Sequence, residues 1–271
     1  MSNVLVIGGS GFIGKAIIKE MSKHENFNIY GTYFNGKLPL SKEKSFKLNI
    51  EETEDIDKVL NHVRPELVIS CLRGDFSKQL KLHIKIAEWL KKTGGRLYFL
   101  STTNVFDKDL SKPHYEDDIP DSFTDYGKYK IECEERIRGI LGDDACIIRI
   151  PQVWGQESPR MKELLELTSI NEKVIVYPEL FISAISDKSV AEKLSFIIRN
   201  DLKGTFHLAS KDIINYKEFY VRLMGQLGIN RTLIQEDLEM KGYFALLSKR
   251  DSEFYGQADI DIDSVINYLT R

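Results

Sequence analysis

The stretch VLVIGGSGFIG at residues 4–14 decides the fold of this chain. Its first four residues are apolar, which predicts a buried strand, and Gly8, Gly11 and Gly14 follow at three-residue spacing. Apolar side chains then recur with helical periodicity as far as Met21. We therefore expect a strand, a glycine turn and a helix at the start of the chain.

This glycine turn suits the binding of a dinucleotide. Glycine is needed where the backbone takes a positive φ or must approach a phosphate closely. The N-terminus of the following helix offers free N–H groups and the positive end of its dipole to an anion. The spacing Gly-x-x-Gly-x-x-Gly differs from the general Gly-x-Gly-x-x-Gly pattern, but it occupies the same strand-to-helix position.

A second informative stretch is DYGKYK at residues 125–130. Tyr126 and Lys130 are four residues apart, so on a helix their side chains lie on one face. A free phenol has a pKa of about 10, and a cation held beside it lowers that value. The pair could therefore transfer protons near neutral pH. Because Lys128 and Tyr129 lie close by, the motif alone also fits an exposed helix with snorkelling side chains.

Composition narrows the class of protein. The chain has 271 residues, a net charge of −3 and a pI near 6.0, which fit one α/β unit or a large domain with a smaller one packed on it. No basic excess suggests nucleic acid or an anionic membrane surface as a partner. Apolar runs are shorter than the roughly 18 residues of a membrane span, and residues 1–3 lead directly into a strand, so we expect a soluble, cytoplasmic protein. The three cysteines lack Cys-x-x-Cys spacing, which supports neither a disulfide framework nor a zinc site.

Short apolar runs alternate with longer helical patterns over the first half of the chain. Strands are expected at residues 27–32, 45–48, 67–71, 97–100 and 146–150. Helices are expected between them at residues 53–62, 76–92 and 126–141. This alternation predicts an α/β domain over residues 1–150, with a Rossmann-like, doubly wound parallel sheet and helices on both faces.

The alternation weakens after residue 151. Helical patterns separated by short strands such as 204–208 lie at residues 159–169, 187–200, 216–227 and 261–269. We expect residues 151–271 to form a smaller C-terminal portion. Its boundary is diffuse, since the chain crosses between the two parts more than once.

Taken together, these motifs resemble the extended short-chain dehydrogenase/reductase superfamily. The glycine turn combined with Thr102, Tyr126 and Lys130 is typical of it, and the most similar branch is that of the dTDP-4-dehydrorhamnose reductases. LSTTNVFD at residues 100–107 is similar to that branch's Ser-Thr-Asp-Tyr-Val-Phe-Asp-Gly, and RIPQVWG at 149–155 to its Arg-Thr-x-x-Val-Tyr-Gly. GTFHLA, residues 204–209, also resembles its Gly-x-x-His segment, so the similarity extends from the first strand to about residue 210.

The resemblance implies roles for three catalytic residues. A nicotinamide would pass hydride to a substrate carbonyl, and Tyr126 would supply the proton that the carbonyl oxygen then needs. Thr102 would donate a hydrogen bond to the same oxygen, while Lys130 would lower the phenol pKa and hold the ribose hydroxyls of the cofactor. Thr102 fits the pattern better than Thr103, being three residues before Val105. The alternative for Thr102 is a strand-end hydroxyl that bonds to its own backbone.

The cofactor is expected to be NADP(H), with NAD possible. NAD-specific sites place a carboxylate at the end of the second strand, whereas residues 30–37 contain none, and Thr32 or Lys37 could meet a 2′-phosphate. Asn49 and Ile50 stand where the family has residues beside the adenine. The remaining expected cofactor residues, besides Tyr126 and Lys130, are Gly8, Ser10, Gly11, Phe12, Ile13, Gly14, Cys71 and Leu72.

In this family the C-terminal part caps the carboxyl ends of the strands and encloses the substrate. Several departures from the pattern suggest diverged substrate recognition: Ile7 replaces a Thr, residues 71–74 replace a run of small residues, and residues 249–251 lack an Arg-Pro. The candidate substrate-binding residues are Arg73, Thr103, Asn104, Gln152 and Trp154. A solvent salt bridge for Arg73, and simple packing for Gln152 and Trp154, are the alternatives.

The resemblance implies reduction of a nucleotide-activated 4-keto-6-deoxy sugar, for a cell-surface polysaccharide or glycoconjugate. A 4,6-dehydratase is disfavoured, because that group has Thr-Asp-Glu where this chain has TTN at residues 102–104. An epimerase that retains NAD remains an alternative. So does a binding or regulatory subunit like the β-subunit of methionine adenosyltransferase, which also resembles this branch. We expect a nucleotide sugar as the substrate and leave a homodimer open.

Overall fold

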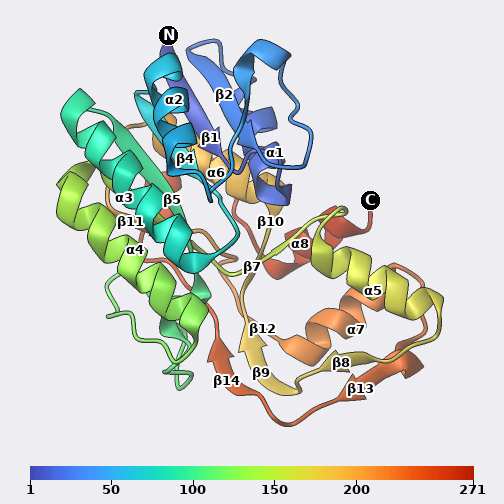
Figure 1. Cartoon of the computed structure of the whole chain (residues 1–271). Coiled ribbons are helices and arrows are strands. Elements are labelled where there is room, and N and C mark those ends of the chain that lie inside the picture. Colours follow the sequence, from blue (N-terminus) through green and yellow to red (C-terminus); the bar gives the residue numbers. More distant parts are fainter.

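A seven-stranded parallel sheet forms the centre of the molecule (Figure 1). The computed structural model describes residues 1–271 apart from the side chain of Thr53. The strand order is β11-β6-β5-β4-β1-β2-β3, and every neighbouring pair is parallel. The strands are β1 (Ser2–Ile7), β2 (Phe27–Tyr33), β3 (Ser45–Lys47), β4 (Leu67–Ser70), β5 (Arg96–Thr102), β6 (Ala145–Ile150) and β11 (Thr205–His207). The predicted doubly wound α/β fold is confirmed.

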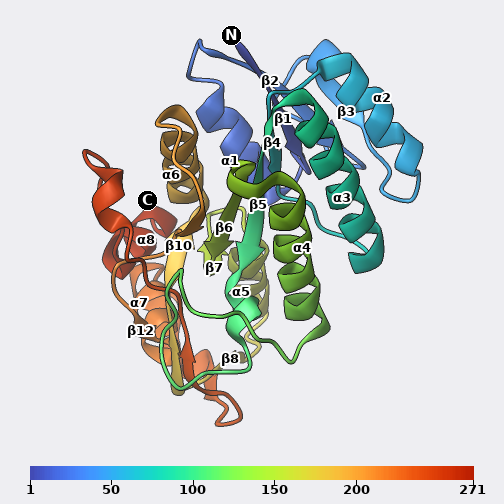
Figure 2. The same ribbon diagram turned by 90° about the vertical axis from the view of Figure 1, so that its left-hand side faces the viewer.

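Both faces of the sheet are buried under helices, which is why its strands are continuous apolar runs rather than alternating ones. In β1, Val4 and Val6 enter one hydrophobic cluster, while Leu5 and Ile7 enter another on the opposite face. Figure 2 shows the sheet between the two helical layers. One layer contains α1 (Phe12–Met21) and α6 (Asp187–Arg199), and the other contains α2 (Thr53–Val63), α3 (Phe76–Thr93) and α4 (Asp125–Leu141).

The chain order of the strands reverses beside β1. From β1 the chain proceeds outward through β2 and β3, and then returns to β4 on the other side of β1. In open parallel sheets, ligands bind in the crevice outside the carboxyl ends of the strands at such a switch point. The glycine turn after β1 and the segment after β4 therefore meet where a ligand is expected.

The second half of the chain adds small sheets and helices over this edge. Its helices are α5 (Pro159–Ser169), α7 (Tyr216–Gln226) and α8 (Ile262–Leu269). Its strands form the sheets β10-β7, β12-β9-β14 and β13-β8. They are β7 (Gln152–Trp154), β8 (Val174–Val176), β9 (Glu179–Ile182), β10 (Ala184–Ser186), β12 (Ile214–Asn215), β13 (Ile234–Glu236) and β14 (Lys241–Phe244).

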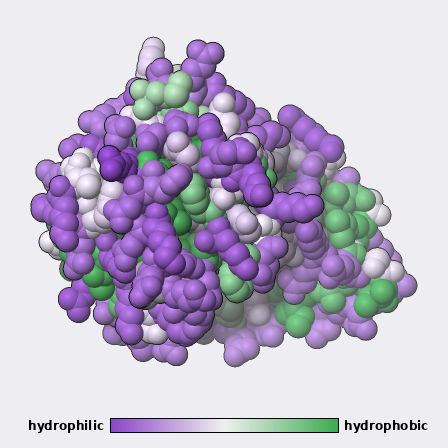
Figure 3. All heavy atoms as spheres, turned by 45° about the horizontal axis from the view of Figure 1, so that its top comes forward, coloured by the Kyte–Doolittle hydropathy of each residue, from purple (hydrophilic) through white to green (hydrophobic). Residues whose placement is uncertain are grey.

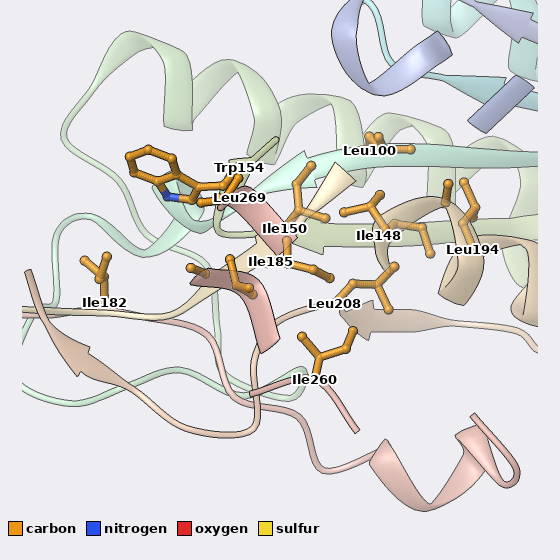
Figure 4. Packing of buried hydrophobic residues seen from close by; sticks show 14 of the residues in the cluster. Leu100, Ile148, Ile150, Trp154, Ile182, Ile185, Leu194, Leu208, Ile260 and Leu269 are labelled. Atoms are coloured by element: carbon orange, nitrogen blue, oxygen red, sulfur yellow. The ribbon is translucent and has the colours of Figure 1, made fainter. Parts of the chain in front are cut away.

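One hydrophobic core joins the two halves. Leu100 and Ile148 of the large sheet belong to the same buried cluster as Ile185 of β10, Leu208 after β11 and Leu269 of α8 (Figure 4). The second half also returns to the first, because β11 pairs with β6 and α6 packs against α1. The two parts thus share one core, and the division at residue 150 remains a proposal about which part binds the cofactor and which part binds the substrate. In the described part of the chain, no helix is both long enough and apolar enough to cross a membrane.

Candidate active site

A cavity of about 380 Å³ lies at the carboxyl ends of the strands. It is lined by residues of α1, of the segments that follow β4, β5 and β6, and of α4, α5 and β14. Most of the side chains predicted for the site meet here. The predicted residues that line it are Phe12, Ile13, Cys71, Leu72, Arg73, Thr102, Thr103, Asn104, Tyr126, Lys130 and Gln152.

The glycine turn beside this cavity has the conformation that its sequence predicts. Gly8 has a φ of +77°, and a Cβ added there would lie 2.9 Å from the carbonyl oxygen of Cys71. A Cβ on Gly14 would collide with the carbonyl oxygen of Gly8. Helix α1 then begins at Phe12 with no capping side chain and no acidic residue in its first turn. Its first N–H groups are thus suited to bind an anion such as a pyrophosphate.

Thr32 supports this turn and does not face a ligand. Its Oγ1 accepts a hydrogen bond of 3.0 Å from the backbone N–H of Gly8, and only 1% of the residue is exposed. The expectation that this hydroxyl meets a 2′-phosphate is therefore not met. The glycine turn covers the end of β2 at Thr32.

Lys37 lies apart from the catalytic cavity, in a neighbouring groove of about 1010 Å³ along α1. Lys15 and Lys19 line the same groove, and none of the three pairs with a carboxylate in the described part of the chain. Asn49 and Ile50 do not line the catalytic cavity. The Asn49 side chain instead accepts a hydrogen bond of 3.1 Å from the backbone N–H of Glu51, in the turn that leads into α2.

Tyr126 and Lys130 lie in the first turns of α4, as predicted. The Lys130 ammonium donates to the carbonyl oxygen of Leu100 at 2.8 Å and lies 5.9 Å from the centroid of the Tyr126 ring. Lys130 is only 5% exposed, and burial lowers the pKa of its ammonium to about 8.

The phenol of Tyr126 differs from the expectation. Burial raises the pKa of Tyr126, and two groups oppose that rise: the charge of Arg73 and a hydrogen bond with Thr102. The lowering of this pKa by Lys130 that the sequence predicts is not found. At neutral pH the phenol is protonated, as an unperturbed phenol is.

Thr102 makes the local hydrogen bonds that were the alternative to a catalytic role, and its catalytic role stays a prediction. Its hydroxyl donates to Oδ1 of Asn104 at 2.9 Å and accepts a longer bond of 3.3 Å from the Asn104 backbone N–H, which caps the short helix η2 (Thr103–Phe106). Thr103 lines the cavity too, but its hydroxyl donates to the carbonyl oxygen of Ile150 at 3.3 Å.

Of the two candidates after β6, only Gln152 reaches the cavity. Its Oε1 is buried and has no hydrogen-bond partner among the described residues, so it could accept a bond from a ligand. Trp154 is fully buried and does not line the cavity. Its ring packs 5.0 Å from Phe219 and 5.7 Å from Tyr220 of α7, so the prediction of a substrate contact there is wrong.

Sequence reasoning missed residues that the C-terminal part brings to the cavity, namely Arg160 and Glu163 of α5 and Phe244 of β14. Ser158 and Pro159 mark a helix start, since Ser158 caps α5 and Pro159 occupies its first turn. That signal could have placed Arg160 in the first turn of a helix at the cleft. The sequence around Phe244 contains no signal that would place this residue at the cavity.

These groups can carry out proton transfer next to a bound anion. A protonated phenol, a hydroxyl and an ammonium lie at one end of the cavity, and the uncapped helix N-terminus lies beside it. Arg73 and Arg160 line the same cavity, and neither pairs with a carboxylate in the part of the chain that the structure describes. The site is therefore positively charged and suited to an anionic ligand with a reducible oxygen.

Comparison with known proteins identifies a family for this chain. Residues 79–239 match the model of the family described as RmlD substrate binding domain. The chain is 24% identical over 235 residues to methionine adenosyltransferase 2 subunit beta of Bos taurus, covering 77% of this chain and 67% of that protein. It is 23% identical over 255 residues to the spore coat polysaccharide biosynthesis protein SpsK of Bacillus subtilis (strain 168), covering 89% and 85%.

A similar fold is found among solved structures. The crystal structure of dTDP-4-dehydrorhamnose reductase from Bacillus anthracis str. Ames in complex with NADP has a TM-score of 0.81 to this chain. It covers 99% of this chain and 98% of its own, at 17% identity. At that identity the likeness shows a shared fold.

Proposed function

Because the chain belongs to the RmlD substrate binding domain family, we propose that it uses NADPH to reduce the keto group of a nucleotide-activated 4-keto-6-deoxy sugar. The family lies in the extended short-chain dehydrogenase/reductase superfamily, so the chain is an NAD(P)-dependent oxidoreductase of that type. One observation supports the reduction of such a sugar. Thr102, Tyr126 and Lys130 line one cavity, beside the uncapped N-terminus of the helix that follows the glycine turn.

The residues of the chain divide the work of such a reduction. Bound NADPH would supply the hydride. Tyr126, protonated at neutral pH, gives its proton to the oxygen that gains negative charge, and the Thr102 hydroxyl turns from Asn104 to donate a hydrogen bond at the same place. Lys130, on the next turn of α4, would hold the ribose hydroxyls. The amides at the start of α1 would bind the pyrophosphate.

The preference for NADPH over NADH is supported by charge. Lys37 lies in a groove with Lys15 and Lys19, and residues 30–37 contain no carboxylate that would repel a 2′-phosphate. With Thr32 engaged by the glycine turn, Lys37 is the predicted residue left to meet that phosphate. NAD remains the alternative cofactor.

A nucleotide sugar suits the rest of the cavity. Its diphosphate needs cations, and Arg160 reaches the cavity from α5 without a carboxylate partner in the described part of the chain. The unpartnered Oε1 of Gln152 would accept a hydrogen bond from a sugar hydroxyl. The relative SpsK is named for the biosynthesis of spore coat polysaccharide, which supports a role of this kind.

The first experiment mixes the purified protein with NADPH or NADH and with dTDP-, UDP- and GDP-linked 4-keto-6-deoxy sugars, following the absorbance of the reduced nicotinamide. We expect consumption with one sugar and faster consumption with NADPH. Tyr126→Phe should lower kcat at least about 100-fold while leaving the Kd for NADPH unchanged, because only the proton donor is lost. Tyr255→Phe, at a tyrosine that is 91% exposed, is the matched control. Turnover by Tyr126→Phe at the wild-type rate would refute the assignment.

Two other functions stay in view. The relative from Bos taurus is named as a subunit of another enzyme, which favours a regulatory role as the second candidate. NADPH binding without consumption of any sugar, together with co-elution of a second protein, would support it. Conversion of a sugar with no net loss of NADPH would indicate an epimerase. A cytoplasmic location and a homodimer belong to the same proposal and are tested by fractionation and light scattering.

A further inference from the structure

We propose that Asn104 is a positioning residue, whose side-chain amide decides whether the Thr102 hydroxyl can donate to the substrate oxygen. The inference deepens the proposed function and rests on Thr102 as a hydrogen-bond donor to that oxygen. Asn104 stands where the reductase branch that this chain resembles has a tyrosine. The proposal gives Asn104 a part besides the substrate contact that the sequence predicts for it.

Two hydrogen bonds join Thr102 and Asn104 at the end of β5. The Thr102 hydroxyl donates to Oδ1 of Asn104 at 2.9 Å, and the backbone N–H of Asn104 donates to the same hydroxyl at 3.3 Å. Both residues line the cavity, and only 9% of Thr102 is exposed. In the described part of the chain, the side-chain N–H groups of Asn104 have no hydrogen-bond partner.

This arrangement commits the proton of the Thr102 hydroxyl. A threonine hydroxyl has one proton to donate and two lone pairs that can accept. Its proton is donated to Oδ1, and one lone pair accepts from the backbone N–H of Asn104, so one lone pair is left for a ligand. A substrate carbonyl oxygen also offers only lone pairs. The two oxygens therefore cannot form a hydrogen bond while the amide keeps this orientation.

A half-turn of the Asn104 amide releases that proton. Rotation about χ2 exchanges Oδ1 with Nδ2, and this torsion is broad and roughly two-fold in asparagine. No other hydrogen bond is lost, because Nδ2 has no partner among the described residues. The Thr102 oxygen then accepts from Nδ2 and from the backbone N–H of Asn104, and its O–H is free to donate to the substrate oxygen.

The two orientations of the amide match the two forms of the substrate. A keto oxygen only accepts, so it requires the orientation in which Asn104 donates to Thr102. An alcohol product has an O–H of its own and can donate to Thr102 in the orientation that the structure shows. An ionised carboxylate in place of the amide would only accept, and it would hold the Thr102 proton in both cases.

The first test titrates a carboxyl group in place of the amide, without cofactor or sugar. In Asn104→Asp, the Thr102 hydroxyl should donate to the new carboxylate and lower its pKa. We expect the NMR signal of this carboxyl carbon, in the full-length protein, to titrate about one pH unit lower than in Asn104→Asp combined with Thr102→Val. Combination with Thr102→Ser keeps a hydroxyl and should restore the lower value. The other titratable groups that line the cavity are the same in all three proteins, namely Cys71, Arg73, Tyr126, Lys130, Arg160 and Glu163.

The second test measures turnover of a 4-keto-6-deoxy sugar. At about pH 8, Asn104→Asp should lower kcat about tenfold or more and leave KM within about twofold. The ratio of its kcat to that of the wild type should rise as the pH falls, because a protonated carboxyl group can donate to Thr102. Asn104→Ala leaves the Thr102 hydroxyl free to rotate and should lose less. Asn61→Asp, at an exposed position of α2 outside the cavity, introduces the same charge and is the control.

The outcomes separate control of Thr102 from other roles of Asn104. Equal titrations with and without the Thr102 hydroxyl overturn the proposal. It is also overturned if Asn104→Ala loses as much kcat as Asn104→Asp and the ratio to the wild type does not change with pH, since a substrate contact or a purely structural role predicts that result. If the titration depends on the Thr102 hydroxyl but no sugar consumes NADPH, the proposed reduction fails and the control of Thr102 by residue 104 is still supported.

Discussion

Arg160 is the residue outside the catalytic group whose charge we expect to matter most for binding. It lies in the first turn of α5, reaches the cavity from the C-terminal part, and has no carboxylate partner among the described residues. A charge-assisted hydrogen bond to a diphosphate contributes roughly 1.5–3 kcal/mol. Arg160→Gln should therefore raise KM for the nucleotide sugar about tenfold and leave kcat within about twofold, because the contact is remote from the reacting carbonyl.

Steady-state kinetics at saturating NADPH measure this effect. Lys91→Gln, at an exposed position of α3 outside both the catalytic cavity and the neighbouring groove, removes the same charge and should change neither constant. An unchanged KM in Arg160→Gln would contradict the diphosphate contact. A fall in kcat alone would place Arg160 near the reacting end instead.

Single residues also show where sequence patterns stop being informative. The glycines and the Tyr126–Lys130 pair follow rules of spacing within one turn or one helix, so local sequence predicts them. Thr32 and Trp154 depend on what packs over them. The Thr32 hydroxyl is bound by the N–H of Gly8, 24 residues earlier, and the Trp154 ring packs against Phe219 of α7. Neither neighbour can be identified from local sequence.

At the scale of elements, the start of α4 decides where Tyr126 lies. Asp107, which follows η2, accepts hydrogen bonds at 2.7 Å from the Ser122 hydroxyl and the Phe123 backbone N–H, and another from the Thr124 hydroxyl. Thr124 in turn caps α4 by accepting from the Gly127 N–H at 3.1 Å. The Asp107 carboxylate thus links the segment that follows Thr102 to the start of the helix that carries Tyr126.

Asp107→Ala should therefore reduce both stability and turnover. Losing a carboxylate with three donors costs about 1–3 kcal/mol of unfolding free energy, and a displaced Tyr126 should lower kcat by about tenfold or more. Urea denaturation and steady-state kinetics measure the two effects. Asp261→Ala removes the cap of α8, which lies away from the cavity, and should cost about 1 kcal/mol with no loss of turnover. Equal loss of turnover in both variants would show a general effect of stability.

The elements that sequence predicted best are those with long internal periodicity. Helices α3, α4, α5 and α6 begin and end within two residues of the predicted bounds, because each presents one apolar face to the sheet or to the C-terminal core. For the strands of the small sheets, the sequence predicted that short strands are present but not where they begin and end. Each has two to four residues, and they exist only through pairing with partners far along the chain, such as β14 with β9.

Across the whole molecule, apolar and polar surface are unevenly distributed. Figure 3 shows one face that is largely hydrophilic, with hydrophobic residues gathered on its right-hand lobe. Exposed apolar residues of the C-terminal part include Leu165, Ile170, Ile175 and Leu238. The interior also contains polar groups that water does not reach, among them the side chains of His83 and His207. These make the stability of the whole fold depend on pH.

His83 and His207 are both buried and held neutral. Nε2 of His83 lies 2.7 Å from the Ser70 hydroxyl, and burial lowers the pKa of this histidine to about 3. Nδ1 of His207 lies 3.0 Å from the carbonyl oxygen of Leu247, and burial lowers its pKa to about 4. Both values are below the ordinary 6.5, so between pH 6.5 and about 4 the unfolded chain binds protons that the folded chain does not.

Stability should consequently be complete above pH 6.5 and decline as the pH falls toward 4. Each histidine contributes about 1.4 kcal/mol per pH unit, so by about pH 5 the two together should cost roughly 4 kcal/mol of unfolding free energy. Urea midpoints across this range measure the slope. His83→Gln should remove about half of it, while His62→Gln, at an exposed position of α2, should leave it as in the wild type. If the urea midpoint stays constant down to about pH 5, the two imidazoles bind protons as readily in the folded chain as in the unfolded chain. That result would contradict the lowering of their pKa values by burial.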